Sequence, residues 1–288
     1  MCGFAGSVFL NNKFKVISYK PWTEKCSELL EHRGPDAKGF YLNHNWNLSI
    51  TARRLRVHDL DSRADQPFED DQKKYLVAFN GAIFNYKELR RELKQLNINF
   101  VTDSDTEVVM YALAVWGEKA FNKFDGMFSI CFLDKRKKQI LIGRDKLGIK
   151  PLYIFLDKDK LIFSSEIKPI IAHPLVKKEF NITFVPEFFA FQNIMPPYTL
   201  FKNVNVLEPG TCININLESK KHDIQTYWSL EEFINIKSKS NYIEEAIHNS
   251  LKNCWNADRK IGIQLSGGVD SSLITAISSQ ELHLNNIN

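Results

Sequence analysis

Cysteine is scarce in this sequence, and its few positions support neither of the structures that cysteine commonly builds. The count is odd, no CxxC pair occurs, and the five positions are widely spaced: Cys2, Cys26, Cys131, Cys212 and Cys254. This pattern excludes a disulfide framework and a structural zinc site. We therefore predict no metal ligands, assign four cysteines to packing, and set Cys2 apart because it follows Met1.

Long apolar stretches and long runs of one charge are also missing. Apolar segments such as residues 127–133 are far shorter than the roughly 20 residues that cross a membrane, and no apolar leader follows the first residues. The 38 basic and 34 acidic residues are interspersed and give a net charge of +4. We therefore expect a cytoplasmic globular protein with neither membrane nor nucleic-acid partners.

Short β-patterns dominate the sequence up to Leu217. The expected strands are residues 3–10, 46–52, 75–79, 127–133, 139–144, 152–155 and 161–164. Two helical patterns interrupt them, residues 86–95 and 106–116, and Asp105 stands at the position of an N-cap before the second. This mixture predicts an α+β fold for a first domain, residues 2–217.

A polar stretch, residues 218–241, predicts an exposed linker and a domain boundary. The second domain, residues 242–288, begins with a helical stripe formed by Ile243, Ala246, Ile247, Leu251 and Cys254. An apolar run, residues 261–265, predicts a buried strand that leads through a glycine-rich turn into another helix.

The glycine-rich turn has the composition of a phosphate-binding loop. Strand, turn and helix bring backbone N–H groups and a helix N-terminus together, and Gly267 and Gly268 remove side chains that would block a phosphate. A Walker-type loop would need a lysine that is absent here. The sequence SGGVDSS of residues 266–272 resembles the pyrophosphate loop of ATP pyrophosphatases. A serine-rich turn without a ligand is the alternative.

Cys2 can become an unusual nucleophile at the other end of the chain. Removal of Met1 would place a thiol and a free α-amine on one residue, and an amine with a pKa of about 8 can accept the thiol proton. The alternative is an incidental second residue. Cys2 is therefore a candidate N-terminal nucleophile.

Several further motifs occur in a characteristic order. They are residues 2–6 (CGFAG), 32–36 (HRGPD), 54–60 (RLRVHDL), 66–67 (QP), 79–86 (FNGAIFNY), 104–107 (SDTE), 143–153 (GRDKLGIKPLY), 164–168 (SSEIK) and 207–211 (LEPGT). Together they resemble the glutamine-hydrolysing asparagine synthetases. The resemblance implies an N-terminal-nucleophile hydrolase-like αββα sandwich, a class II glutamine amidotransferase, followed by the first strand and helix of an incomplete α/β adenylating domain.

The same resemblance implies roles for individual residues. Cys2 would attack the carboxamide of glutamine, and Asn80 with Gly81 would form the oxyanion hole. Arg54 would hold the α-carboxylate of glutamine, or be a solvated arginine of a basic cluster; Asp105 would pair with the α-ammonium, cap a helix, or do both. Taken alone, Asn80-Gly81 is also the dipeptide of a tight hairpin turn.

Two other positions belong to the implied glutamine pocket. The backbone around Val57 would line it, and Ala82 stands where the family usually has glutamate. A missing charge-assisted hydrogen bond at Ala82 would cost roughly 1–3 kcal/mol of glutamine binding, or very little if Asp105 carries the ammonium alone. His32 and His58 are interpreted as structural, because an N-terminal nucleophile needs no histidine.

The resemblance also implies partners for the second domain. ATP with Mg would bind at Leu265, Ser266, Gly267, Gly268, Asp270 and Ser271. Aspartate would be activated as β-aspartyl-AMP and amidated by the ammonia, whereas the glutaminase half needs no cofactor.

Too few residues follow the turn to complete a parallel sheet. The chain is then either a portion of the synthetase or a truncated relative. A glutaminase serving another acceptor, a non-catalytic glutamine-binding relative and a homodimer stay open.

Overall fold

The computed structural model describes residues 2–234, 242–255 and 258–281. The chain divides into two compact units. Residues up to Arg56 and 61–229 form the first unit, and residues 57–60 with those from Leu230 onward form the second. Across the described ranges, no helix is both long and apolar enough to span a membrane.

The first unit contains two six-stranded sheets whose paired strands are antiparallel. The first sheet has the order β10-β8-β9-β1-β3-β2. Its strands are β1 (Gly3–Phe9), β2 (Ala37–Asn43), β3 (Leu48–Arg54), β8 (Tyr153–Leu156), β9 (Lys160–Ser164) and β10 (Asn205–Val206). β1 therefore lies inside the sheet, between β9 and β3, which fixes the backbone that follows Cys2 on both sides.

The second sheet has the order β12-β11-β7-β6-β5-β4. Its strands are β4 (Phe68–Glu69), β5 (Tyr75–Ile83), β6 (Gly126–Asp134), β7 (Gln139–Arg144), β11 (Thr211–Asn216) and β12 (His222–Thr226). Because β5 pairs with β6 along its whole length, Asn80 and Gly81 lie in a strand opposite Ser129 and Phe128. The hairpin-turn interpretation of Asn80-Gly81 is therefore wrong.

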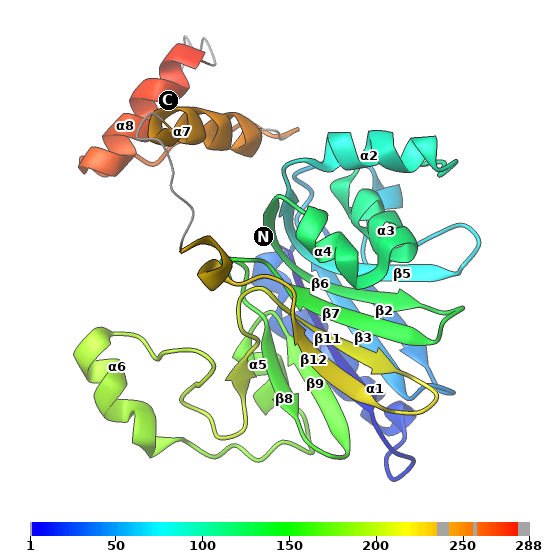
Figure 1. The fold of residues 1–288 in the computed structure, drawn as a ribbon. Coiled ribbons are helices and arrows are strands. Elements are labelled where there is room, and N and C mark those ends of the chain that lie inside the picture. The colour runs from blue at the N-terminus through cyan, green and yellow to red at the C-terminus, as the bar shows by residue number, and fades with distance from the viewer. Residues whose placement is uncertain (1, 235–241, 256–257, 282–288) are drawn as a thin grey trace. The chain divides into compact units, whose positions relative to one another are not determined.

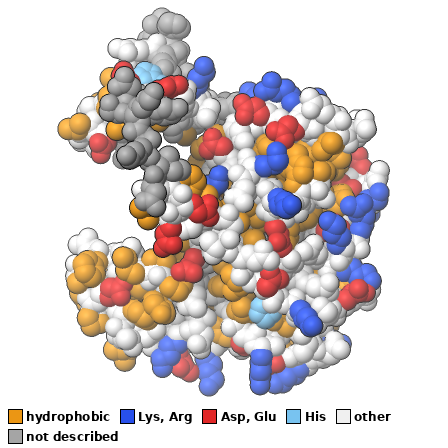
Figure 2. Space-filling model, in the orientation of Figure 1, with side chains coloured by type: hydrophobic (Ala, Val, Ile, Leu, Met, Phe, Trp, Pro, Cys, Tyr) orange, Lys and Arg blue, Asp and Glu red, His pale blue; other side chains and the backbone are white. Residues whose placement is uncertain are grey.

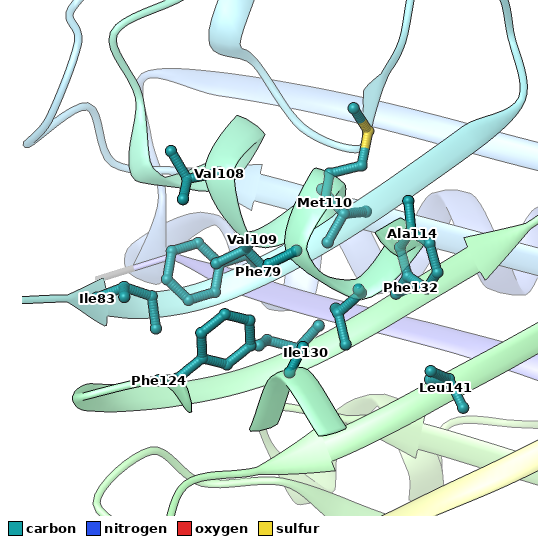
Figure 3. Close-up of a cluster of buried hydrophobic side chains, with 14 of the residues drawn as sticks. Phe79, Ile83, Val108, Val109, Met110, Ala114, Phe124, Ile130, Phe132 and Leu141 are labelled. Atoms are coloured by element: carbon teal, nitrogen blue, oxygen red, sulfur yellow. The ribbon is translucent and has the colours of Figure 1, made fainter. Parts of the chain in front are cut away.

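Helices cover the outer faces of both sheets (Figure 1). α2 (Tyr86–Gln95), α3 (Asp105–Trp116) and α4 (Ala120–Lys123) bury the outer face of the second sheet, and α1 (Lys20–Leu29) with α5 (Ile167–Ile171) buries that of the first. Side chains of α3 share one apolar layer with Phe79, Ile130 and Phe132 (Figure 3). A third buried cluster fills the space between the sheets. The predicted αββα sandwich is thus confirmed.

The remaining elements are short or lie in the second unit. They are the 3-10 helices η1 (Val16–Tyr19), η2 (Glu31–Arg33), η3 (Ser62–Ala64), η4 (Gly117–Lys119), η5 (Ile182–Phe184) and η6 (Leu230–Phe233), and the helices α6 (Val185–Phe191), α7 (Tyr242–Cys254) and α8 (Val269–Glu281).

Two expectations about element ends differ from the structure. The N-cap of α3 is Ser104, whose side chain accepts a hydrogen bond from the Thr106 N–H, so Asp105 is the first helical residue and its carboxylate points elsewhere. β12 lies within residues 218–241, expected as linker, because the exposed residues 222–226 pair with β11 and form the edge of the sheet.

The second unit lacks the predicted strand. Residues 261–265 have no strand pairing, and Ile261 and Leu265 are exposed at 41% and 59%. An apolar strand needs neighbouring strands to satisfy its backbone groups, and no described residue of this unit supplies one.

Cys254 is exposed, whereas Cys26, Cys131 and Cys212 are buried, so the packing assignment is wrong for Cys254.

Candidate active site

The thiol of Cys2 lies against the chain that leaves β3. Its Sγ donates to the Leu55 carbonyl at 3.7 Å and accepts from the Leu55 N–H at 3.4 Å. The Arg33 Nε donates to the Cys2 carbonyl oxygen at 3.0 Å. A Cβ on Gly3 would come within 2.9 Å of the Arg33 side chain, so glycine there leaves room for this contact. Cys2 is therefore braced through its backbone and its thiol.

Burial raises the pKa of the Cys2 thiol above its ordinary value of 9.0. The hydrogen bond with the Leu55 backbone and the positive charge of Arg54 act in the opposite direction, and Asp105 raises the pKa further. Because these charges reach the thiol, the fold has brought together Cys2, Arg54 and Asp105, which are far apart in the sequence. At neutral pH the thiol needs a base to become a thiolate.

Arg54 is a buried arginine and not a solvated one. Its side chain is 3% exposed, and its Nη1 donates to the Asp61 carbonyl and to the Asp65 carboxylate, both at 2.9 Å. Arg56 makes a two-pronged contact with Asp65 through Nε and Nη2 at 3.1 and 2.6 Å. Burial would raise the pKa of Asp65, but these arginines prevail and lower it. Asp65 thus fixes the position of Arg54.

Asn80 is buried, and among the described residues one polar atom of its side chain has no hydrogen-bond partner. Its Nδ2 donates to Ser129 Oγ at 3.4 Å, but within the described ranges Asn80 Oδ1 has no hydrogen-bond partner. Half a turn of the amide exchanges the two atoms, so one polar position of the carboxamide stays available. A buried polar atom without a partner costs about 1–3 kcal/mol and calls for an explanation.

Gly81 cannot carry a side chain. A Cβ there would lie 2.1 Å from the Met127 carbonyl oxygen and 2.8 Å from the Phe128 Cα. The next residue, Ala82, pairs with Met127 and is partly buried. Glycine is therefore required by the close approach of β6, whatever its chemical role.

Asp105 links α3 to the end of β5. Its Oδ2 accepts from the Ile83 N–H at 3.1 Å, and the residue is 4% exposed. A short chain of hydrogen bonds runs beside it, because Gln66 accepts from the Phe79 N–H at 2.6 Å and donates to Thr106 at 3.4 Å. The carboxylate is thus held near the strand that carries Asn80, Gly81 and Ala82.

Val57 is grouped differently from the other residues of the implied glutamine pocket. It belongs to the second unit, where its carbonyl accepts from the Asp258 N–H at 3.0 Å. His32 has a structural contact, because its Nε2 lies 2.7 Å from Glu166, which also accepts from Arg33.

Sequence reasoning missed Arg33 and Lys150. Lys150 is buried, which lowers its pKa from the ordinary value, and the charges of Arg33 and Cys2 also influence that pKa. Each lies inside one of the motifs, HRGPD or GRDKLGIKPLY. The motifs carried no sign that Arg33 contacts the Cys2 backbone or that Lys150 and Cys2 interact electrostatically.

The turn of the second unit is organised by its own hydroxyl groups. Ser271 Oγ accepts from the Ser266 N–H at 3.3 Å, contacts Ser266 Oγ at 3.0 Å and donates to the Gly268 carbonyl at 3.1 Å. Gly267 has a φ of +82°, which side chains rarely adopt. Asp270 lies in the first turn of α8, whose leading N–H groups lack helical acceptors. In the described ranges, no three His, Cys, Asp or Glu side chains gather as metal ligands.

The fold of the first unit is that of known amidotransferases. A solved glutamine phosphoribosylpyrophosphate amidotransferase from B. subtilis superposes with a TM-score of 0.55 and 16% identity, covering 79% of this chain and 49% of the other. A second structure, a regulatory enzyme of purine biosynthesis, gives a TM-score of 0.53 at 16% identity over the same shares. Both likenesses define the fold class of the sandwich.

The sequence match is more specific. Residues 1–228 match the glutamine amidotransferase domain family, and residues 242–287 match the asparagine synthase family. This chain belongs to the glutamine amidotransferase domain family and carries the start of an asparagine synthase domain.

Curated relatives cover nearly the whole chain. A putative glutamine-hydrolysing asparagine synthetase of Methanocaldococcus jannaschii is 31% identical over 96% of this chain and 56% of the relative. Asparagine synthetase 2 of Bacillus subtilis is 31% identical over 98% of this chain and 39% of the relative. The chain therefore spans about half the length of the curated relatives it matches.

Proposed function

We propose that this chain hydrolyses glutamine to glutamate and ammonia, with Cys2 as the nucleophile. The observation that carries the proposal is the convergence of the Cys2 thiol, Arg54 and Asp105 in a sandwich of the amidotransferase family. Arg54 would hold the α-carboxylate of glutamine, and Asp105 would hold the α-ammonium. Opposite charges at the two ends of an amino acid fix its orientation toward the thiol.

The proposed reaction begins with the α-amine that Met1 removal exposes. The amine takes the thiol proton, and Sγ bonds to the carboxamide carbon of glutamine. The Asn80 carboxamide and the Gly81 N–H would stabilise the oxyanion, and the uncommitted polar position of Asn80 supports this role. The carbon–nitrogen bond then breaks as the proton passes to the leaving nitrogen. Ammonia departs, and water hydrolyses the thioester to glutamate.

Two residues would shape the rest of the pocket. The backbone at Val57 would line it, and Ala82 would leave the ammonium of glutamine to Asp105 alone. We expect the alanine at position 82 to give a higher KM for glutamine than a glutamate there would give, with kcat retained.

We further propose that the ammonia serves the ATP-dependent amidation of aspartate through β-aspartyl-AMP. The residues that would hold ATP are Leu265, Ser266, Gly267, Gly268, Asp270 and Ser271. Free N–H groups at the start of α8 and the open turn at Gly267 fit a phosphate chain. When bound, ATP supplies a leaving group for aspartate, and Mg would be held mainly by its phosphates.

We also propose that the protein is cytoplasmic, because its cysteines are free thiols and the cytoplasm keeps thiols reduced.

The glutaminase proposal is tested with purified chain from which Met1 has been removed. We expect glutamine-dependent ammonia release that Cys2→Ala abolishes, a loss of at least a hundredfold. Cys131→Ala, at a buried cysteine of β6, is the matched control and should keep the activity. No ammonia from the processed wild type would contradict the proposal and leave a glutamine-binding relative.

A further inference from the structure

Residues 180–201 belong to the first unit and form an arm that leaves the two sheets and returns to them. At its base, Phe180 and Phe201 form a β-bridge, and the Asn181 N–H donates to the Leu200 carbonyl at 2.7 Å. The arm contains η5 and α6, and Figure 1 shows α6 standing away from both sheets. We call residues 180–201 the aromatic arm.

The aromatic arm exposes an unusual set of large apolar side chains. Their exposed fractions lie between 42% and 79%, and the residues are Phe180, Ile182, Phe188, Phe189, Phe191, Met195 and Tyr198. Figure 2 shows apolar side chains gathered over α6. Isolated apolar residues are normal at a surface, but a contiguous group of this kind marks an interaction site.

The arm is folded although its apolar face is open. Phe184 stacks on Tyr198 with ring centroids 4.5 Å apart, and Glu187 accepts from the Met195 N–H at 2.5 Å. The Val206 N–H of β10 donates to the Pro197 carbonyl at 2.8 Å. These contacts hold the exposed rings outward in a defined arrangement, which lowers the entropy cost of binding.

Its size and charge fit a permanent interface. Seven side chains of roughly 200 Å² each, exposed by about 60% on average, offer about 850 Å², and a standard interface buries about 800 Å² per partner. Glu187 is the only charged residue between 180 and 201, and its carboxylate already has a partner. Depletion of charge is typical of the core of a permanent interface.

We propose that the aromatic arm is the docking surface for the part of the asparagine synthase domain that the relatives carry and this chain does not span. The relatives are about twice as long, and only residues 242–287 of this chain match that family. In a chain that carries both domains, the two stay together permanently. Their interface can then be apolar, because it never has to separate and face water. This inference rests on the proposed function, since it takes the asparagine synthase domain as the acceptor of the ammonia.

The test measures binding of the full chain to the asparagine synthase domain of the Methanocaldococcus jannaschii relative, produced as a separate polypeptide. We expect the wild type to bind, and hydrogen exchange in residues 180–201 to slow in the complex. The double variant Phe189→Asp, Phe191→Asp should bind at least tenfold more weakly. Phe40→Asp, at a phenylalanine of β2 that is 47% exposed, is the control for adding an aspartate at a surface ring and should bind as the wild type does.

Other results of the binding measurement decide against the proposal. No binding by the wild type, or equal binding by the double variant and the control, overturns it. A wild-type dimer in light scattering that only the double variant dissociates, without a loss of domain binding, assigns the arm to a second copy. Ammonia release is measured in parallel: if it is absent while the arm variants lose domain binding, the glutaminase proposal fails and the docking surface stands.

Discussion

At the scale of single residues, His173 is a buried histidine held in its neutral form. Its Nδ1 accepts from the Leu175 N–H at 3.1 Å, and its ring stacks on Tyr19 and packs edge-on against Trp22. Burial and the nearby charge of Lys160 lower its pKa from 6.5 to about 3. The folded protein therefore keeps His173 neutral at neutral and mildly acidic pH.

His173 predicts a loss of stability in mild acid. Between pH 6.5 and about 3 the unfolded chain binds a proton that the folded chain refuses, so stability falls as the pH falls. From pH 7 to 4.5 we expect the wild type to lose about 2–3 kcal/mol more than His173→Asn. Urea titrations at the two pH values measure this difference. Equal losses in both proteins would contradict it.

Gly81 predicts a second residue-scale effect, on stability and activity together. Gly81→Ala forces a methyl group to within 2.1 Å of the Met127 carbonyl oxygen, so β5 and β6 must separate. We expect a cost of about 3 kcal/mol and the loss of ammonia release. Gly262→Ala is the control, because no atom lies within 4 Å of the added methyl group. If the Gly81→Ala variant unfolds at the same temperature as the wild type, β5 and β6 accommodate the methyl group and the prediction is wrong.

At the scale of elements, the N-cap of α3 is Ser104 and not the expected Asp105. Ser104 is 1% exposed and bonds the Thr106 N–H at 3.1 Å, which leaves Asp105 for the Ile83 N–H of β5. Ser104→Ala should lower the free energy of unfolding by about 1 kcal/mol. Ser18→Ala, at an exposed serine, should change it little. Chemical denaturation compares the two, and equal stability would place the cap elsewhere.

Elements with strong local patterns could be predicted from the sequence. β7 and α2 have the expected bounds. A short apolar run rich in isoleucine marks β7, and leucines four residues apart mark α2; both are local properties. β12 could not be predicted, because its five exposed residues become a strand only by pairing with β11. Residues 261–265 fail for the opposite reason: an apolar run without paired neighbours stays outside any strand.

At the scale of the whole molecule, the apolar core belongs to the first unit. All three buried clusters, including their partly buried members, end by Tyr227. We expect residues 1–229 alone to unfold cooperatively and, with Met1 removed, to release ammonia from glutamine at a rate within about threefold of the full chain. Circular dichroism and the ammonia assay measure this. An unfolded shortened chain would show that the second unit supports the sandwich.

The sequence by itself determined the α+β class, the nucleophile candidate and the serine-glycine turn, because each depends on residue types at fixed spacing. The ordered motifs resemble one family, and that resemblance implied the αββα layers. Only the tertiary structure placed Arg54 and Asp105 within electrostatic reach of the Cys2 thiol and braced Cys2 with Arg33. The aromatic arm likewise became visible only when folding left all of its rings except Phe201 outside the three buried clusters. The physical reason is the same in each case: spacing along a chain fixes local conformation, but proximity and burial depend on how sheets stack.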